Sequence, residues 1–170
     1  MNENPDLADA GSYLRIDYSP WRLVTDNVMG GRSAGSIDRT EKDRHSVVTL
    51  SGRVSTKNNG GFIQMVQDIP VHMALVASQY EGIRLNVSGN GETYNIHLRT
   101  AGLWLPWQAY RADFTSSTQW QSVEIPFESF FPYKISRPLD VSKLKRIGIV
   151  AIGRDFDADI SISEIGFFRD

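Results

Sequence analysis

From Ser46 onward, apolar and polar residues alternate with a period of two in one segment after another. This period places apolar side chains on one face of a strand, and turn residues separate the segments at the spacing of a sandwich or barrel. The sequence therefore predicts an all-β fold. The apolar sets that share a face are Val48, Leu50 and Val54; Ile83, Leu85 and Val87; Tyr94, Ile96 and Leu98; Tyr110, Ala112 and Phe114; Val123 and Ile125; Ile147 and Ile149.

The dipeptide Asn90-Gly91 separates the predicted strands 82–88 and 92–99. It is the strongest short-range hairpin signal, because both residues accept positive φ angles. We therefore expect the two strands to be antiparallel neighbours, with their polar residues gathered on one sheet face together with those of a following strand. The polar face so predicted consists of Arg84, Asn86, Ser88, Asn95, His97, Arg99, Arg111 and Asp113.

Near the end of the chain, the apolar alternation changes phase between Ile162 and Ile165. One extra residue in a strand produces such a change, which predicts a β-bulge near Ser163-Glu164. Helical content is expected to be minor. Single turns are predicted in 72–79 and at 127–131, each too short to be stable in isolation.

The length of 170 residues suits a single domain, 1–170, with one core. Residues 1–11 are expected to be flexible. The net charge of −2 disfavours the long positive surface of a nucleic-acid-binding protein, and the absence of cysteine excludes disulfides and thiolate zinc sites. The N-terminal segment lacks the apolar core of a secretory signal, and no stretch is long enough to span a bilayer. These features predict a cytoplasmic protein without direct membrane insertion.

The segment from Trp21 to Ser33 combines a tryptophan, an acidic residue and a double glycine within thirteen positions. Gly-Gly allows a tight reversal, and the side chains of Asp26 and Asn27 can bond their own backbone in an Asx-turn. A structured loop is the economical interpretation. Contact of Asp26 with a ligand or partner is the alternative.

The same loop contains Gly31-Arg-Ser33-Ala-Gly35, a literal match to the nucleophile elbow of hydrolases. That elbow requires a strand that turns sharply into a helix, and the residues that follow here have no helical periodicity. Since short motifs match often by chance, we reject a hydrolase.

Two features could form a binding site. Guanidinium and amide groups on the polar face could bind a polyol, a carboxylate or a phosphate, although a solvated sheet face is the simpler alternative. The loop 100–108 contains Trp104 and Trp107 beside two leucines. These tryptophans could stack on a sugar ring or anchor a protein partner. Burial of both rings against the end of the sandwich is the alternative.

Asp155, Asp157 and Asp159 alternate as at the start of a calcium loop, but the glycine and glutamate of an EF-hand loop are missing. A charged turn is therefore the preferred interpretation, and a calcium site of another kind is the alternative. The three histidines are scattered without metal-ligand spacing. No motif indicates an enzyme, a metal or a cofactor.

Several sequence blocks together resemble the complex I intermediate-associated protein 30 family, from about residue 12 to about residue 168. The first block is distinctive, and the others follow in the family's order. The blocks are Trp21…Asp26-Asn-Val-Met29-Gly30-Gly31-Arg-Ser33; Gly52-Arg-Val54-Ser55…Asn59-Gly60-Gly61-Phe62; Tyr80-Glu-Gly82-Ile83; Gly89-Asn-Gly91…Tyr94; Trp120…Ile125-Pro126-Phe127…Phe130; and Ile160-Ser-Ile162…Ile165-Gly166-Phe167.

The resemblance implies a galactose-binding-like jelly-roll β-sandwich of two antiparallel sheets, an architecture shared with several carbohydrate-binding modules. It also implies a relation to assembly factors, because mitochondrial members hold intermediates of respiratory complex I. The family supplies no catalytic residues. Without a transit peptide at its N-terminus, this chain is expected to be a short bacterial member.

We therefore predict a non-enzymatic binding domain that engages a protein partner, with subunits of a respiratory complex as candidates, through loops at one end of the sandwich. The alternative is a carbohydrate or small-ligand binding module that uses the polar face and the tryptophan loop. The candidate binding residues are Asp26, Asn27, Met29, Arg32, Asn59, Tyr94, His97, Arg99, Trp104, Trp107 and Arg111.

Overall fold

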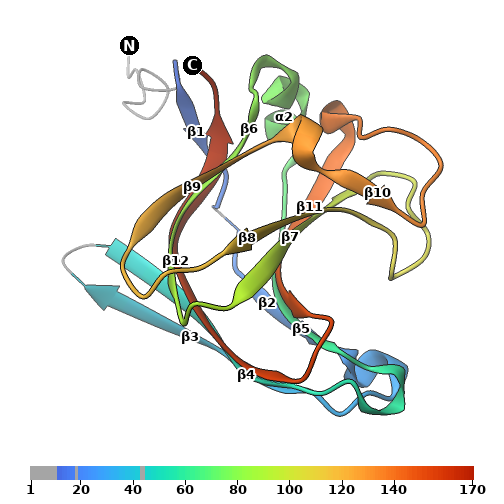
Figure 1. Cartoon of the computed structure of the whole chain (residues 1–170). Coiled ribbons are helices and arrows are strands. Elements are labelled where there is room, and N and C mark those ends of the chain that lie inside the picture. The colour runs from blue at the N-terminus through green and yellow to red at the C-terminus, as the bar shows by residue number, and fades with distance from the viewer. Residues whose placement is uncertain (1–10, 18, 43–44) are drawn as a thin grey trace.

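The computed structural model describes residues 11–17, 19–42 and 45–170, without the side chains of Lys42, His45 and Asn59. These residues form two antiparallel six-stranded sheets packed face to face (Figure 1). The first sheet has the spatial order β3 (Ala34–Lys42), β4 (His45–Val54), β12 (Phe156–Phe168), β6 (Gly82–Gly89) and β9 (Gln121–Pro126), and β1 (Tyr13–Arg15) pairs with β12. The second sheet has the order β10 (Phe131–Tyr133), β8 (Ala109–Thr115), β7 (Thr93–Thr100), β11 (Leu144–Ile152), β5 (Phe62–Asp68) and β2 (Arg22–Thr25).

The core lies between the two sheets, as period-two alternation requires. The apolar residues expected to share faces are buried, except that Val123 is only partly buried. Leu50, Leu85, Ile96 and Leu98 have no exposed surface. The prediction of an all-β jelly-roll sandwich is therefore confirmed.

The predicted hairpin of strands 82–88 and 92–99 is wrong. β12 and β9 occupy both edges of β6, whereas β11 and β8 occupy both edges of β7. The turn at Asn90-Gly91 therefore carries the chain from one sheet to the other. The predicted polar face is split accordingly: Arg84 lies on the first sheet and bonds Glu124, whereas His97 and Arg111 pair across β7 and β8 of the second.

Two local predictions are confirmed. The pairing of β12 with β6 shifts register between Ile162 and Glu164, which is the expected bulge. The expected helical turns appear as α2 (Val71–Val76) with the 3₁₀ helix η3 (Ala77–Gln79), and as η4 (Phe127–Ser129). Three further 3₁₀ turns are η1 (Asp26–Met29), η2 (Lys57–Asn59) and η5 (Val141–Lys143). The flexibility expected for residues 1–11 falls, apart from Gly11, on residues outside those described.

None of the helices in the described ranges combines the length and the apolarity that crossing a membrane would require.

Replacing Tyr94 with phenylalanine should destabilise the fold by about 1–3 kcal/mol. The Tyr94 hydroxyl donates a hydrogen bond to Asn90 Oδ1 (2.7 Å) and accepts one from Asp159 N (2.9 Å). The change leaves both groups without this partner. Urea unfolding measures the loss, with Tyr133→Phe as the control because that ring is exposed on an edge strand. Equal losses in the two variants would contradict this role of the hydroxyl.

Candidate functional site

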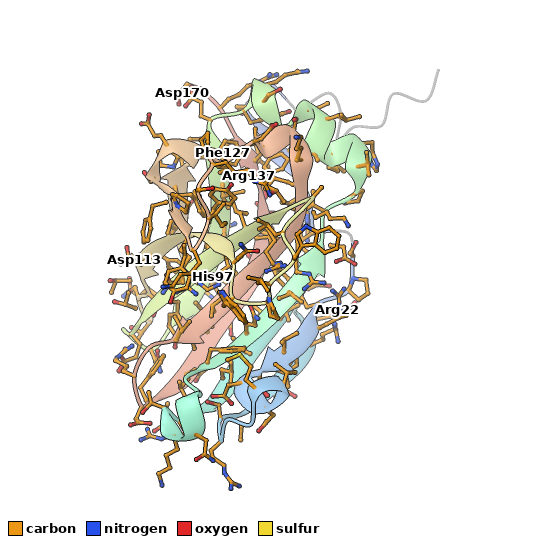
Figure 2. The ribbon with its side chains drawn as sticks, turned by 90° about the vertical axis from the view of Figure 1, so that its right-hand side faces the viewer. Arg22, His97, Asp113, Phe127, Arg137 and Asp170 are labelled. Carbon is orange, nitrogen blue, oxygen red and sulfur yellow. The ribbon has the colours of Figure 1, made fainter. Side chains whose placement is uncertain are left out.

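The outer face of the second sheet carries a groove of about 600 Å³. Its floor is formed by strands β5, β11, β7 and β8, and Figure 2 looks onto this side of the molecule, with His97 near the centre. One wall comes from Val28 and Met29 of η1 with the glycines after η2, and the other from the loop between β7 and β8. In Figure 1 both walls project from the same side of the sandwich.

The floor is built by strand register. Val66, Gly148, His97 and Arg111 lie side by side on neighbouring strands, since each is paired with the next. Gly148 contributes to the depth of the groove. A Cβ at this position would lie 3.0 Å from Gln64 Oε1 and 3.3 Å from a methyl group of Val66.

A single buried carboxylate fastens the wall formed by η1 and η2. Asp26 has no exposed surface. Its Oδ1 accepts from Ser33 N (3.0 Å), and its Oδ2 accepts from Ser33 Oγ (2.5 Å), Gly61 N (2.6 Å) and Phe62 N (3.3 Å). Burial alone would raise the pKa of Asp26, but these hydrogen bonds outweigh burial and lower it. Asp26 therefore holds two loops together and does not face the groove.

The same carboxylate explains why glycines occupy two positions in the loops that it joins. A Cβ on Gly31 or on Gly60 would overlap Asp26. Ser33, the serine of the rejected hydrolase motif, is buried, donates to Asp26 and accepts from Ser55 N (2.9 Å). It is therefore a structural residue of the loop.

A single guanidinium fastens the opposite wall. Arg99 Nη1 donates to the carbonyl oxygens of Leu105 (3.0 Å), Pro106 (3.2 Å) and Gln108 (2.6 Å), and Nη2 donates to that of Leu103 (3.4 Å). Burial lowers the pKa of Arg99, as does the charge of Arg146. Arg99 thus supports the β7–β8 loop from beneath, so most of its hydrogen-bonding capacity is already used.

The tryptophans on this loop are exposed. Trp104 is 89% exposed and Trp107 is 47% exposed. Gln108 links the loop to the neighbouring segment, because its Nε2 donates to Lys134 O (3.1 Å) while its Oε1 accepts from Leu105 N (3.1 Å). Burial of both rings, the alternative considered for this loop, does not occur.

His97 and Arg111 form the centre of the floor. Burial, with the charges of Arg111 and Arg99, lowers the pKa of His97 to about 3, so the imidazole is neutral near pH 7. The Arg111 guanidinium lies over the Tyr133 ring, 3.6 Å from its centroid. Burial lowers the pKa of Arg111, although an arginine remains charged in proteins. The centre of the floor therefore carries one positive charge and one neutral ring.

An ion-pair cluster lies at one end of the floor. Asp68 pairs with Arg22 (3.2 Å) and with Arg146 (3.7 Å). The Arg22 hydrogen bond is the largest of the effects that lower the pKa of Asp68, and the charges of both arginines contribute. This cluster is satisfied within the protein.

The other candidate residues are distributed as follows. Met29 lines the groove, whereas Asn27 bonds Thr25 Oγ1 (2.9 Å) and Ser33 O (3.1 Å) within its own loop. Arg32 is exposed on the same loop, and the side chain of Asn59 lies outside the described part of the chain. Tyr94 is buried and points into the core, so it is not on the groove face.

Among the groove residues that the sequence candidates did not include, Gln64, Arg146 and Gly148 form part of the floor. They belong to β5 and β11, which reach β7 only through pairing between distant segments. Two of the three aspartates of the calcium hypothesis have other roles, since Asp155 accepts from Thr56 N and Asp157 pairs with Arg53. Within the described residues, no group of three or more potential ligands is placed to hold a metal ion.

Solved carbohydrate-binding modules are similar to this chain in structure. The family 11 carbohydrate-binding module from Clostridium thermocellum, in complex with a β-1,3-1,4-mixed-linked tetrasaccharide, is 15% identical with a TM-score of 0.72, and the match covers 92% of this chain and 94% of that chain. A family 30 carbohydrate-binding module is 13% identical with a TM-score of 0.61, covering 94% of this chain and 88% of that chain. At such identities the likeness shows the fold alone.

Sequence comparison gives a family. The model described as Complex I intermediate-associated protein 30 (CIA30) matches residues 12–162, which is most of the chain. No curated protein matches the sequence.

Replacing Asp26 with asparagine should destabilise the fold by about 3 kcal/mol, because the amide cannot accept all four hydrogen bonds and would turn a donor toward other donors. Asp38→Asn is the matched control, since Asp38 is exposed on edge strand β3. Chemical denaturation compares the two. An Asp26→Asn variant as stable as the control would contradict the fastening role.

The lowered pKa of Asp26 also predicts how the stability of the fold depends on pH. The pKa of Asp26 is lowered in the folded state from 3.8, so its stabilising effect is complete above about pH 4 and is lost as the pH falls through the folded-state value. The difference in stability between wild type and Asp26→Asn should therefore shrink below about pH 4. A difference that stays constant into this range would disagree with the lowered pKa.

Replacing Arg99 with methionine should free the β7–β8 loop while leaving the core intact. Four backbone carbonyls lose their donor, so amide hydrogen exchange across residues 101–108 should accelerate by about tenfold or more. Arg53→Met on the first sheet serves as the control. Unchanged exchange in the loop would show that Arg99 does not hold it.

Proposed function

This chain belongs to the complex I intermediate-associated protein 30 family, and we propose that it is a non-enzymatic binding domain. In this proposal the domain engages a protein partner through the groove of the second sheet. The description of the family names an association with complex I intermediates, which is a function of protein contacts. We propose subunits of a respiratory complex as the partners.

The observation that carries the proposal is the pair of exposed apolar walls on either side of the groove. Val28 is 72% exposed and Met29 45% exposed on one wall, and Trp104 and Trp107 are exposed on the other. Large apolar side chains that gather around a cavity on a protein surface usually mark a contact site, and tryptophan often dominates the binding energy there. Both walls are held by internal hydrogen bonds, so the apolar groups are presented in fixed positions.

The arrangement of Ser33 and His97 supports binding, and not catalysis, as the role of the groove. Ser33 is buried beneath a wall and engaged by Asp26, and neutral His97 is not hydrogen-bonded to a nucleophile. A general base needs a group within hydrogen-bonding reach of the atom it activates. These features support binding as the role of the groove.

A carbohydrate ligand is the second candidate. Exposed tryptophans beside polar floor residues such as Gln64 and His97 would allow stacking on sugar rings with hydrogen bonds from below. The fold shared with carbohydrate-binding modules supports this candidate by analogy only.

The double replacement Trp104→Ala, Trp107→Ala should abolish capture of respiratory-complex subunits by the tagged protein from lysate of the native organism. Truncating exposed aromatic anchors typically costs 2 kcal/mol or more of binding energy each, about thirtyfold in affinity. Trp120→Ala is the matched control, because Trp120 is 52% exposed but does not line the groove. Mass spectrometry identifies the captured proteins. If the double variant still captures these subunits, the groove is not the site that binds them.

Titration with neutral oligosaccharides distinguishes the second candidate. Saturable quenching of tryptophan fluorescence by one of them, lost in the double variant, together with no selective capture of protein, would favour carbohydrate binding over the proposed function.

A further inference from the structure

Among the described residues, the Arg111 guanidinium has no hydrogen-bond or ion-pair partner. Other arginines of the sandwich are engaged: Arg15, Arg22, Arg53, Arg84, Arg146 and Arg154 have carboxylates within ion-pair distance, and Arg99 bonds backbone carbonyls. Within the described residues, no carboxylate or carbonyl lies within hydrogen-bonding distance of the Arg111 guanidinium, and its Nε is buried without an acceptor. A partly buried charge without a partner has lost hydration that nothing in the protein replaces.

The geometry of Arg111 is nevertheless fixed. Its guanidinium stacks on Tyr133, and its strand position between His97 and Phe131 is set by register. Stacking of this kind holds the planar group in one orientation while its remaining N–H groups stay available. Arg111 is thus positioned in the way that bidentate recognition of a carboxylate requires.

The charged residues that line the groove are of one sign. Arg99, Arg111 and Arg146 line the groove, and no aspartate or glutamate of the described residues lines it. The nearest acid along the strand, Asp113, does not line the groove, and Asp68 is engaged by two arginines. His97 is neutral. The groove is therefore positive in a chain whose net charge is −2, which favours an anionic occupant.

The walls of the groove indicate which class of molecule bears the anionic group. Val28 and Met29 are exposed aliphatic and thioether side chains, and both line the groove. Such groups suit the apolar side chains of a protein, since methionine adapts to varied partners, whereas the hydroxyl-covered edges of a sugar gain little from them. A protein segment with an acidic residue satisfies both the walls and the floor.

We propose that Arg111 is the anion-recognising residue of the groove and that it binds the side-chain carboxylate of an acidic protein segment whose large apolar side chains contact the two walls. This inference rests on the proposed function and specifies the chemistry of the partner. His97 beside it is neutral, so Arg111 is the charged group at the centre of the floor.

The experiment selects peptides from a random library on the wild-type protein and then measures the affinity of the best synthetic peptide. The enriched peptides should carry aspartate or glutamate together with aromatic or aliphatic residues. Replacing the acidic residue by its amide should weaken binding about tenfold or more, and Arg111→Gln should cause a similar loss. In a double-mutant cycle, the two changes together should cost little more than either alone.

Two controls keep the test informative. Arg53→Gln removes the same charge from the first sheet and should leave peptide affinity unchanged. If Arg111→Gln fails to fold, the wild-type protein alone still tests the inference, because affinity for the acidic peptide should fall with added salt and affinity for its amide counterpart should not. Equal salt dependence of the two peptides would overturn the proposal.

The outcomes separate this inference from the proposed function. Neutral apolar peptides that need Trp104 and Trp107 but not Arg111 would overturn the carboxylate site and leave the proposed function standing. Binding of hexagalacturonate, a carboxylate-bearing oligosaccharide, without binding of any peptide would overturn both, in favour of an acidic polysaccharide.

Discussion

Packing between the two sheets orients the side chains that form the groove. Ile96 and Leu98 have no exposed surface on the inner side of β7, so His97 and Arg99 between and beside them must point outward. A shift of one residue in the pairing register of β7 would exchange its two faces and place a guanidinium in the core. The same alternation holds on β8, where Tyr110 and Ala112 are buried on either side of Arg111. The floor of the groove is thus the outer surface of a well-specified core, and its geometry is as stable as the sandwich itself.

Charged groups in this part of the molecule act in two different ways. Asp26 and Arg99 each lie beneath a wall and bond mainly to backbone groups, the first accepting N–H donors and the second donating to carbonyls. A full charge strengthens such hydrogen bonds, and one side chain can then organise a whole loop. Arg111 is on the same face, but in the described part of the chain its guanidinium stacks on the ring of Tyr133 and has no hydrogen-bond acceptor. The contrast between engaged and unengaged charges separates the residues that build the groove from the residue that we propose binds a partner.

Much of the fold could be predicted from the sequence, because burial imposes a period of two and a bulge changes its phase. The pairing of segments 82–88 and 92–99 could not, since Asn90-Gly91 specifies only a local reversal and the whole sheet decides which strands become neighbours. The site shows the same limit. Trp104, Trp107, His97 and Arg111 are conspicuous in sequence, whereas Gln64 and Gly148 acquire their place only through long-range pairing. The link from Asp26 to Gly61 spans 35 residues. The two Gly-Gly pairs were the available signal for it, because each lies against that carboxylate.

The hydrogen bonds beneath the two walls also have a consequence for rates. Loops that are already ordered need no folding step before contact, so an encounter with a well-oriented ligand can proceed directly to the bound state. Ordering entropy would then be lost chiefly by the incoming segment. Differences in affinity among related ligands should therefore appear mainly as differences in residence time, with similar association rates throughout.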